Sequence, residues 1–330
     1  MDAPQITLDE LKLVGEEVRR SPLVRRTPLL HHAQHLFDDN DHVHGAQLYI
    51  KLESAQNSGS FKIRGAVNQL KRLAQTLPKD TELFTFSSGN YGKAFATVAR
   101  ELNLRCRVLI MTVAPLDRVA MLEDLGAVVE RHEPSAIAAR KAECQAMGMR
   151  YCDPFDDVDL VKAYSSLAFE ILEDVPEPDV LIIGIGGGGL LSGVATTLRA
   201  AGHNSMRIYG VEPETANVMS LCFAAGKRVD LPTVKSIASG LCSPHGGHIT
   251  YPLCRKHINE VVLVSEQELI DTTVKLAKLG FVVEPSGAAA LAAVLNGKIP
   301  ESLSGKRVVV VVSGGNITLE ALQQLISGVH

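Results

Sequence analysis

The stretch DVLIIGIGGGGLLSGVATTLRA, residues 179–200, decides the fold class because it joins a strand, a glycine turn and a helix without a break. Residues 180–183 form a short apolar run typical of a buried strand, and an apolar pattern of helical spacing follows the glycines. A turn of this kind presents free backbone N–H groups and the positive end of a helix to an anion. The stretch therefore predicts a βα unit whose turn binds an anion at the carboxyl edge of a parallel sheet.

Two further segments repeat this design. LFTF at 83–86 runs into SSGNYG and a helical pattern, and RVVVVV at 307–312 runs into SGGN and ITLEALQQLI. Strands and helices alternate along the rest of the chain, which is typical of a doubly wound α/β protein with a mostly parallel sheet. Three such turns in one chain predict a shared pocket for a polyanionic or heavily hydrogen-bonded ligand. A change of composition around YCDPFDDVDL predicts a small domain at 80–157, inserted into a larger domain built from 1–79 and 158–330.

The overall composition narrows the class of protein. The chain has 330 residues, of which 46% are hydrophobic, and a formal net charge of −4 without a run of basic residues. It has no apolar stretch of membrane-spanning length, and its first twenty residues lack the pattern of a signal peptide. Its six cysteines include no C-x-x-C pair, which favours free thiols over disulfides or zinc ligands. These features predict a cytoplasmic protein that binds a small molecule rather than nucleic acid or a membrane.

A dinucleotide site is the first alternative chemistry. Gly184, Gly186 and Gly189 fit the G-x-G-x-x-G pattern, and Glu212 follows the next predicted strand, where a ribose-binding acid belongs. An NAD-dependent oxidoreductase therefore stays open as an alternative from another class. Against it, the four consecutive glycines exceed what a pyrophosphate turn needs, and the SSGN and SGGN turns are left unexplained.

Metal-dependent hydrolysis and simple ligand binding rest on weaker signals. A hydrolytic metal site could use His31, His32 and His35, or Cys242, His245 and His248 of CSPHGGH. No carboxylate or third ligand accompanies the helically spaced His31 and His35, and Pro244 with the glycine pair indicates a surface loop in the second set, so exposed or core-satisfied histidines are favoured. A non-enzymatic module that binds an amino acid or a vitamin phosphate fits the turns equally well. Such a module would not need a lysine placed for covalent chemistry.

The segment NSGSFKIRG, residues 57–65, contains such a lysine. Lys62 follows Phe61 and precedes an apolar, helix-like run, so its amine is expected to be partly buried. Burial lowers the pKa of an ammonium group and thereby makes the amine a nucleophile toward an aldehyde. Pyridoxal phosphate has such an aldehyde, and it would also need a donor-rich turn for its phosphate, which Gly186–Gly189 can supply, and a donor such as an asparagine for its phenolic oxygen.

In combination and in this order, the motifs resemble those of the serine/threonine dehydratase and serine racemase family of fold-type II pyridoxal-phosphate enzymes. The resemblance covers nearly the whole chain and rests on RRTPLL, SGSFKIRGA, SSGN, GGGGL, EPSGAAALAA and SGGN. It implies an α/β protein of two doubly wound open-sheet domains with the cofactor in the cleft between them, and the small domain covers the substrate. It also implies a homodimer.

The same resemblance gives individual residues their roles. Lys62 would form the Schiff base with pyridoxal 5'-phosphate and act as general base, and Phe61 would flank the ring. Asn90 would bind the phenolic oxygen, and Ser313 would meet the pyridine nitrogen. The phosphate would be cradled by the backbone of Gly186, Gly187, Gly188, Gly189 and Leu190.

The substrate side is implied in the same way. Ser88 is placed on the opposite ring face, where racemases of this family reprotonate the substrate, and the SSGN backbone would hold the substrate carboxylate. The expected substrate-binding residues are Ser87, Ser88, Gly89, Asn90, Tyr91 and Lys93.

The chain departs from the family pattern on this substrate side. Tyr91-Gly92-Lys93 replaces the usual His-Gly-Gln, and Asp153-Pro154-Phe155 replaces His-Pro-Phe. Lys93 would bind a second carboxylate of the substrate, and Tyr91 would line the pocket for an aromatic or bulky substrate side chain. The alternative for each is a surface or supporting residue without a role in binding. These changes favour a substrate other than simple serine or threonine.

The divalent-metal site of the family is also incomplete here. Glu212 and Ala216 match it, but Val218 stands where an acidic ligand is usual, so no metal is expected.

A neutral hydroxyl beside the pyridine nitrogen favours elimination over transamination, because the ring then stabilises negative charge less. The sequence therefore predicts an ammonia-lyase that converts a 3-hydroxy amino acid to a 2-oxo acid and ammonia. An amino-acid racemase is the nearest alternative.

Overall fold

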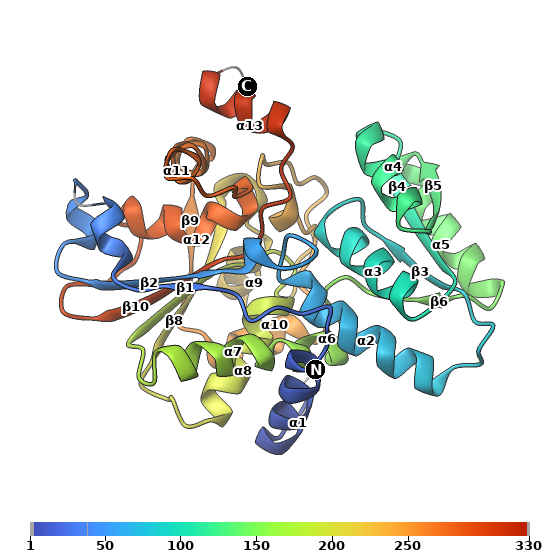
Figure 1. The fold of residues 1–330 in the computed structure, drawn as a ribbon, viewed down its shortest axis with the longest axis horizontal. Coiled ribbons are helices and arrows are strands. Elements are labelled where there is room, and N and C mark those ends of the chain that lie inside the picture. The colour runs from blue at the N-terminus through green and yellow to red at the C-terminus, as the bar shows by residue number, and fades with distance from the viewer. Residues whose placement is uncertain (1–2, 38, 329–330) are drawn as a thin grey trace.

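A computed structural model describes residues 3–37 and 39–328 of the chain as two α/β bodies, each built on its own sheet (Figure 1). The larger sheet has six strands in the order β1-β2-β10-β7-β8-β9. Its neighbours pair in parallel, except that β1 pairs antiparallel with β2. Its strands are β1 (Leu29–Leu30), β2 (Gln47–Leu52), β7 (Val180–Gly184), β8 (Arg207–Pro213), β9 (Glu260–Val264) and β10 (Arg307–Val312).

The central strands of the larger sheet are apolar at consecutive positions because both faces are covered by helices. In β7, Leu181 and Ile183 belong to one buried cluster together with residues of helix α8 (Gly189–Ala200). Val180 and Ile182 point to the other face and join a second cluster with α12 (Pro285–Leu295). This arrangement confirms the doubly wound α/β class predicted from the sequence.

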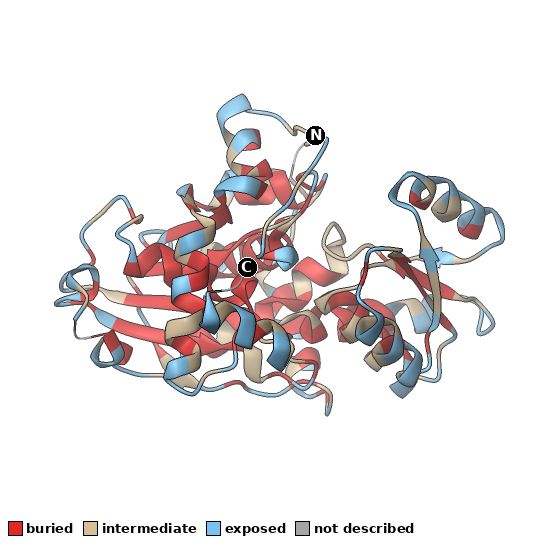
Figure 2. Cartoon of the chain, turned by 90° about the horizontal axis from the view of Figure 1, so that it is seen from above, coloured by how far each residue is buried: buried red, intermediate tan, exposed pale blue. Residues whose placement is uncertain are grey.

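The smaller sheet has four parallel strands in the order β5-β4-β3-β6. They are β3 (Leu83–Phe86), β4 (Cys106–Met111), β5 (Val128–His132) and β6 (Arg150–Tyr151). Its helices are α3 (Asn90–Glu101), α4 (Leu116–Asp124) and α5 (Ile137–Ala146). Buried residues are concentrated in the body of the larger sheet, whereas the smaller body is more exposed (Figure 2).

The remaining helices surround the larger sheet or connect the two bodies. They are α1 (Leu8–Arg19), α2 (Lys62–Thr76), α6 (Val158–Ala163), α7 (Ser165–Asp174), α9 (Val218–Ala225), α10 (Thr250–His257), α11 (Glu266–Lys278) and α13 (Leu319–Ser327). Helix α2 lies at the junction, because its Ile63 and Val67 share a buried cluster with Phe95 of α3. Among the described residues, no helix combines the length and the apolar character needed to cross a bilayer.

All three segments predicted as strand, turn and helix have this structure. The turns after β3, β7 and β10 each end a parallel strand, and α3 and α8 begin within their turns. The carboxyl edges of both sheets therefore supply the loops from which a site can be built.

Candidate active site

The loop that contains Lys62 lies against the turn that follows β10. The Phe61 N–H donates to the Ser313 carbonyl at 3.1 Å, and the Gly315 N–H donates to the Gly59 carbonyl at 2.9 Å. Gly59 has a φ of +77°, and a Cβ there would overlap the Asn316 side chain. The glycine therefore allows the SGS and SGGN turns to pack closely, which places Lys62 at the carboxyl edge of the larger sheet.

Lys62 begins α2, and its amine points toward the smaller body. Its Nζ donates to the Pro154 carbonyl at 2.7 Å and lies 5.1 Å from the ring centroid of Phe61 and 5.8 Å from that of Tyr91. Burial lowers the pKa of the Lys62 ammonium to about 8, and the negative charge of Asp153 offsets part of this effect. A substantial share of the amine is therefore neutral near physiological pH, as a nucleophile toward an aldehyde requires.

The glycine turn after β7 runs directly into α8. Gly188 has a φ of +93°, and a Cβ on Gly187 would overlap the Phe155 ring. The Gly187 carbonyl is fixed by the Thr250 hydroxyl, which donates to it at 2.5 Å. Among the described residues, no protein acceptor takes the backbone N–H groups of Gly186, Gly187, Gly188, Gly189 and Leu190. A row of free donors at the positive end of a helix suits a phosphate.

Ser313 follows β10 directly and is buried at 6% exposure. Its hydroxyl lies 3.5 Å from the Ser286 carbonyl, a long contact that leaves the hydroxyl available to another partner. Ser286 in turn accepts a hydrogen bond from the Gly240 N–H at 2.8 Å. A neutral hydroxyl is thus held at the edge of the sheet next to the Lys62 loop.

A chain of amides crosses from the smaller body to the larger one. Asn90 donates through Nδ2 to the Glu284 carboxylate and accepts at Oδ1 from Asn316 Nδ2 at 2.6 Å. Burial raises the pKa of the Glu284 carboxyl, while the Asn90 hydrogen bond and the charges of Arg118 and Lys93 act in the opposite direction. This chain fixes the first residue of α3 relative to the SGGN turn.

Two cations lie beside this chain. Lys93 Nζ donates to Asn316 Oδ1 at 2.8 Å. Arg118 donates through Nη1 to the Ser88 carbonyl at 3.3 Å and through Nη2 to the Asn316 carbonyl at 3.2 Å. Burial and the nearby Arg118 lower the pKa of the Lys93 ammonium, and Glu284 opposes the shift.

The other residues expected on the substrate side divide into half-buried and buried groups. The Ser87 hydroxyl accepts the Gly89 and Gly92 N–H groups at 3.4 and 3.3 Å and so shapes the SSGN loop. Tyr91 is only 2% exposed, its hydroxyl donates to Gln69, and its ring stacks on Phe95. Its ring face lies toward the Lys62 amine rather than on an open surface.

The incomplete metal motif has a structural use. The Glu212 carboxylate is fully buried and accepts the Met219 and Ser220 N–H groups, both at 2.8 Å. It therefore caps the start of α9 and is not free for a ribose hydroxyl. Burial raises its pKa to about 8. No group of three His, Cys, Asp or Glu side chains suited to a metal occurs within residues 3–37 and 39–328.

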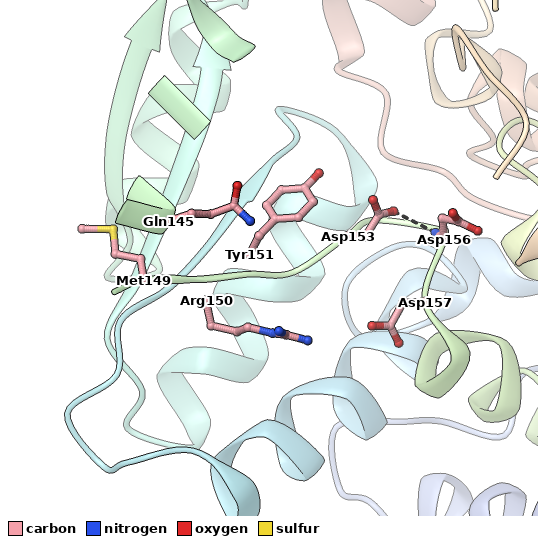
Figure 3. A pocket seen from close by; sticks show the side chains of 7 residues that line it. All are labelled: Gln145, Met149, Arg150, Tyr151, Asp153, Asp156 and Asp157. Atoms are coloured by element: carbon pink, nitrogen blue, oxygen red, sulfur yellow. Dashed lines mark hydrogen bonds between the residues drawn. The ribbon is translucent and has the colours of Figure 1, made fainter. Parts of the chain in front are cut away.

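A cavity of about 420 Å³ lies beside the Lys62 region, between α5, β6 and the loop before α6 (Figure 3). It shares Asp153 with the surroundings of Lys62 but contains none of the predicted cofactor-binding residues. The loop is held in place because Asp156 accepts the backbone N–H groups of His248, Ile249 and Thr250. Figure 3 shows Asp153, Asp156 and Asp157 on this loop, while Gln145, Met149, Arg150 and Tyr151 line the far side.

The residues present fit pyridoxal phosphate. The desolvated Lys62 amine can hold the aldehyde carbon, and the free N–H groups before α8 can hold the phosphate. The available Ser313 hydroxyl can meet the ring nitrogen. These three features come from different parts of the chain and meet where the two bodies face each other.

Fold and site together define a fold-type II pyridoxal-phosphate enzyme. The sequence model described as "Pyridoxal-phosphate dependent enzyme" matches residues 20–314, and the chain belongs to this family. An L-threo-3-hydroxyaspartate ammonia-lyase from Pseudomonas sp is 35% identical over 288 residues, which cover 86% of this chain and 89% of the relative. The catabolic L-threonine dehydratase of Escherichia coli is 31% identical over 84% of this chain and 85% of its own length.

Solved structures agree with these sequence relatives. Maize serine racemase superposes with a TM-score of 0.85 at 30% identity, covering 98% of this chain and 97% of the maize chain. The cofactor is pyridoxal 5'-phosphate, and the ammonia-lyases among the relatives support β-elimination of a hydroxy amino acid. The family and the reaction type predicted from the sequence are thus confirmed.

The structure brings three residues into the site for which the sequence predicted no role. Asn316 is the last residue of SGGN and Glu284 the first of EPSG, so these two motifs were a usable signal. Arg118 lies outside every motif that carries the family resemblance, and nothing in its local sequence points to Ser88 or Asn316.

Proposed function

We propose that Lys62 holds the cofactor and then serves as the general base in the dehydration of a 3-hydroxy amino acid. The observation that supports this role most directly is the environment of its amine, which is desolvated and has a pKa lowered to about 8. An amine with a pKa near the working pH is suited to both tasks, because it attacks as a neutral group and accepts a proton readily.

The remaining roles follow from the positions of the side chains. When bound, the cofactor supplies an electron-withdrawing ring that acidifies the proton on the substrate α-carbon. Lys62 Nζ removes that proton, and the backbone N–H groups of the SSGN loop orient the substrate carboxylate. The proton and the β-hydroxyl leave as water, and hydrolysis of the released enamine gives a 2-oxo acid and ammonia.

The cofactor-binding residues divide between the two bodies in this proposal. Phe61 flanks the ring, Asn90 holds the phenolic oxygen, and the Ser313 hydroxyl meets the ring nitrogen. The phosphate lies on the backbone of Gly186, Gly187, Gly188, Gly189 and Leu190. Residues 80–157 form the small domain that covers the substrate, and residues 1–79 with 158–330 form the large one.

A racemase is the second candidate, and Ser88 supports it. Its hydroxyl has no hydrogen-bond partner among the described residues, so it is free to return a proton to the α-carbon. The likeness to maize serine racemase adds support. The Pseudomonas and Escherichia coli relatives act on L-threo-3-hydroxyaspartate and L-threonine, so the candidate substrates include one acidic and one neutral 3-hydroxy amino acid.

One experiment tests both candidates. Purified holoenzyme is incubated in D₂O with L-serine, L-threonine and L-threo-3-hydroxyaspartate, while 2-oxo acid release and deuterium at the α-carbon are followed. Release of a 2-oxo acid with ammonia supports the lyase. Deuterium exchange with inversion and without 2-oxo acid would establish the racemase instead.

We also propose that the protein is a cytoplasmic homodimer. The resemblance to the dehydratase family supports a dimer, and the six free cysteines suit a reducing compartment. Light scattering during size-exclusion chromatography measures the mass, and a mass of one chain would contradict the dimer.

A further inference from the structure

The strongest unassigned feature beside the site is the pair of cations formed by Lys93 and Arg118. They come from different helices of the smaller body, α3 and α4, and both donate to Asn316 on the larger body. Lys93 lies three residues after Asn90 on α3, so the two side chains occupy the same face of the helix. Lys93 and Asn90 both contact Asn316, so Asn316 connects the Lys93 ammonium to Asn90, which is proposed to hold the phenolic oxygen of the cofactor.

The charge of this pair is not balanced. Lys93 and Arg118 are half-buried, and their hydrogen-bond acceptors are the neutral oxygens of Asn316 and Ser88. Within the described residues, neither side chain has a carboxylate at ion-pair distance. The charge of Glu284 acts on both Lys93 and Arg118, but its carboxylate accepts from Asn90 and forms no ion pair with either cation among the described residues. One carboxylate that pairs directly with neither of two partly desolvated cations leaves a net positive charge, so an anion arriving between them would be bound well.

The reacting amino acid can supply that anion only if it has a second carboxylate. The α-carboxylate is expected at the backbone N–H groups of residues 87–90, at the start of α3. Lys93 lies one turn further along the same helix, and Arg118 contacts the loop from the other side through Ser88. One turn of an α-helix rises about 5.4 Å, which is comparable with the separation of the two carboxylates of a short dicarboxylic substrate.

We infer that Lys93, supported by Arg118, binds the side-chain carboxylate of a dicarboxylic 3-hydroxy amino acid and thereby selects it over serine and threonine. This inference rests on the proposed function and names the substrate class of the same site. Loss of water from 3-hydroxyaspartate followed by hydrolysis gives oxaloacetate and ammonia, with no oxidant or further reactant.

The decisive variant is Lys93→Gln, which removes the charge while the amide can still donate to Asn316. We expect kcat/KM for L-threo-3-hydroxyaspartate to fall by about 10- to 100-fold, the loss typical of a charge-assisted hydrogen bond, and kcat/KM for L-threonine to change by less than about threefold. Lys93→Arg, which keeps the charge, should retain most of the preference. Lys141→Gln is the matched control, because Lys141 is a half-buried lysine of the same body whose ammonium lies over the Tyr151 ring rather than against Asn316 or the SSGN loop.

Binding of unreactive probes gives a second measurement on the same holoenzyme. Calorimetry should show that Lys93→Gln raises the Kd of succinate by about tenfold and leaves that of butyrate unchanged. An equal loss for both substrates or both probes would mean that Lys93 binds the α-carboxylate, and no loss for either would mean that it only links the two bodies. Either result overturns the inference while the lyase activity stands. Failure of the proposed function is distinguishable, since wild-type enzyme would then release no 2-oxo acid from any of the three substrates.

Discussion

The two sheets face the same lysine, but they differ in burial and in charge. Residues 308–312 of β10 in the larger sheet are fully buried, whereas β5 in the smaller sheet is partly exposed, with Val128 at 50%. The larger side offers backbone N–H groups and the neutral hydroxyl of Ser313, and the smaller side offers the cations Lys93 and Arg118. In the proposed function, the more buried edge with its free N–H groups and neutral hydroxyl serves the cofactor, while the more exposed edge with the two cations selects the substrate.

The largest effect is expected from the lysine that both sides share. Lys62→Ala should lower kcat/KM by at least about 1000-fold, because it removes the general base and the amine that holds the cofactor. The melting temperature of the apoprotein should change little, since the Lys62 side chain makes a single hydrogen bond within the described residues, the one to Pro154. The measurement is 2-oxo acid release, together with mass spectrometry after borohydride reduction. Wild type and Lys93→Gln should give a pyridoxyl adduct on Lys62, and an adduct on another lysine would refute the assignment.

The deeper burial of the larger body should make its ion pairs more important for stability, and Arg64 tests this. Arg64 lies on the same first turn of α2 as Lys62. Arg64 is fully buried and bonds Glu53 and Glu170, and Glu170 also pairs with the buried Lys51 at 2.8 Å. Arg64→Ala leaves these carboxylates without their main partner and should lower the free energy of unfolding by about 3–5 kcal/mol. Denaturant titration measures the change.

The matched variant on the smaller sheet is Arg107→Ala. Arg107 bonds Glu82 and Glu130, and the side chains of this network are 18–19% exposed. Water can reach these groups, so the expected loss is about 1 kcal/mol. Equal losses for the two arginines would contradict the difference in burial between the two sides.

Two glycine variants test separately the carboxyl edge of the larger sheet, the proposed cofactor edge, and that of the smaller sheet, the proposed substrate edge. A Cβ at Gly187 would overlap the Phe155 ring, so Gly187→Ala must shift either the turn or the ring. We expect cofactor affinity, measured by absorbance titration of the apoprotein, to fall by about tenfold or more, because the N–H groups of the turn lose their alignment. At Gly89 a Cβ has nothing within 4 Å, and the φ is −101°. Gly89→Ala should therefore leave cofactor affinity within about twofold, and a large loss there would show that the cofactor depends on both edges.

The sequence predicted the cofactor edge better than the substrate edge, for a physical reason. Strand, glycine turn and helix start are local patterns, so residues 179–200 and 307–316 could be interpreted without knowing their neighbours. The predicted strand at 307–312 coincides with β10, and the apolar run at 180–183 lies within β7.

The substrate edge depends on contacts between distant residues. Lys93 donates to Asn316, and the Tyr91 hydroxyl donates to Gln69. Arg118 donates to the Ser88 carbonyl. No local sequence pattern encodes these pairs. The unusual Tyr91-Gly92-Lys93 could be noticed in the sequence, but only the fold separates a buried tyrosine from a lysine at the cleft.

The smallest expected effect concerns the negative charge of Asp153, on the loop of the smaller body, which raises the pKa of Lys62. Only the neutral amine attacks the cofactor aldehyde, so incorporation of pyridoxal phosphate into apoprotein should accelerate as the pH rises through about 8 and then level off. Asp153 favours the protonated form, so Asp153→Asn should lower the pKa of Lys62 and move the midpoint to lower pH, with a faster rate at pH 7. Asparagine can still accept the N–H groups of Phe155 and Asp156, so the loop is expected to keep its shape. Stopped-flow absorbance measures the rate. A midpoint that stays in place or moves upward would show that the larger, uncharged side alone sets the reactivity of the lysine.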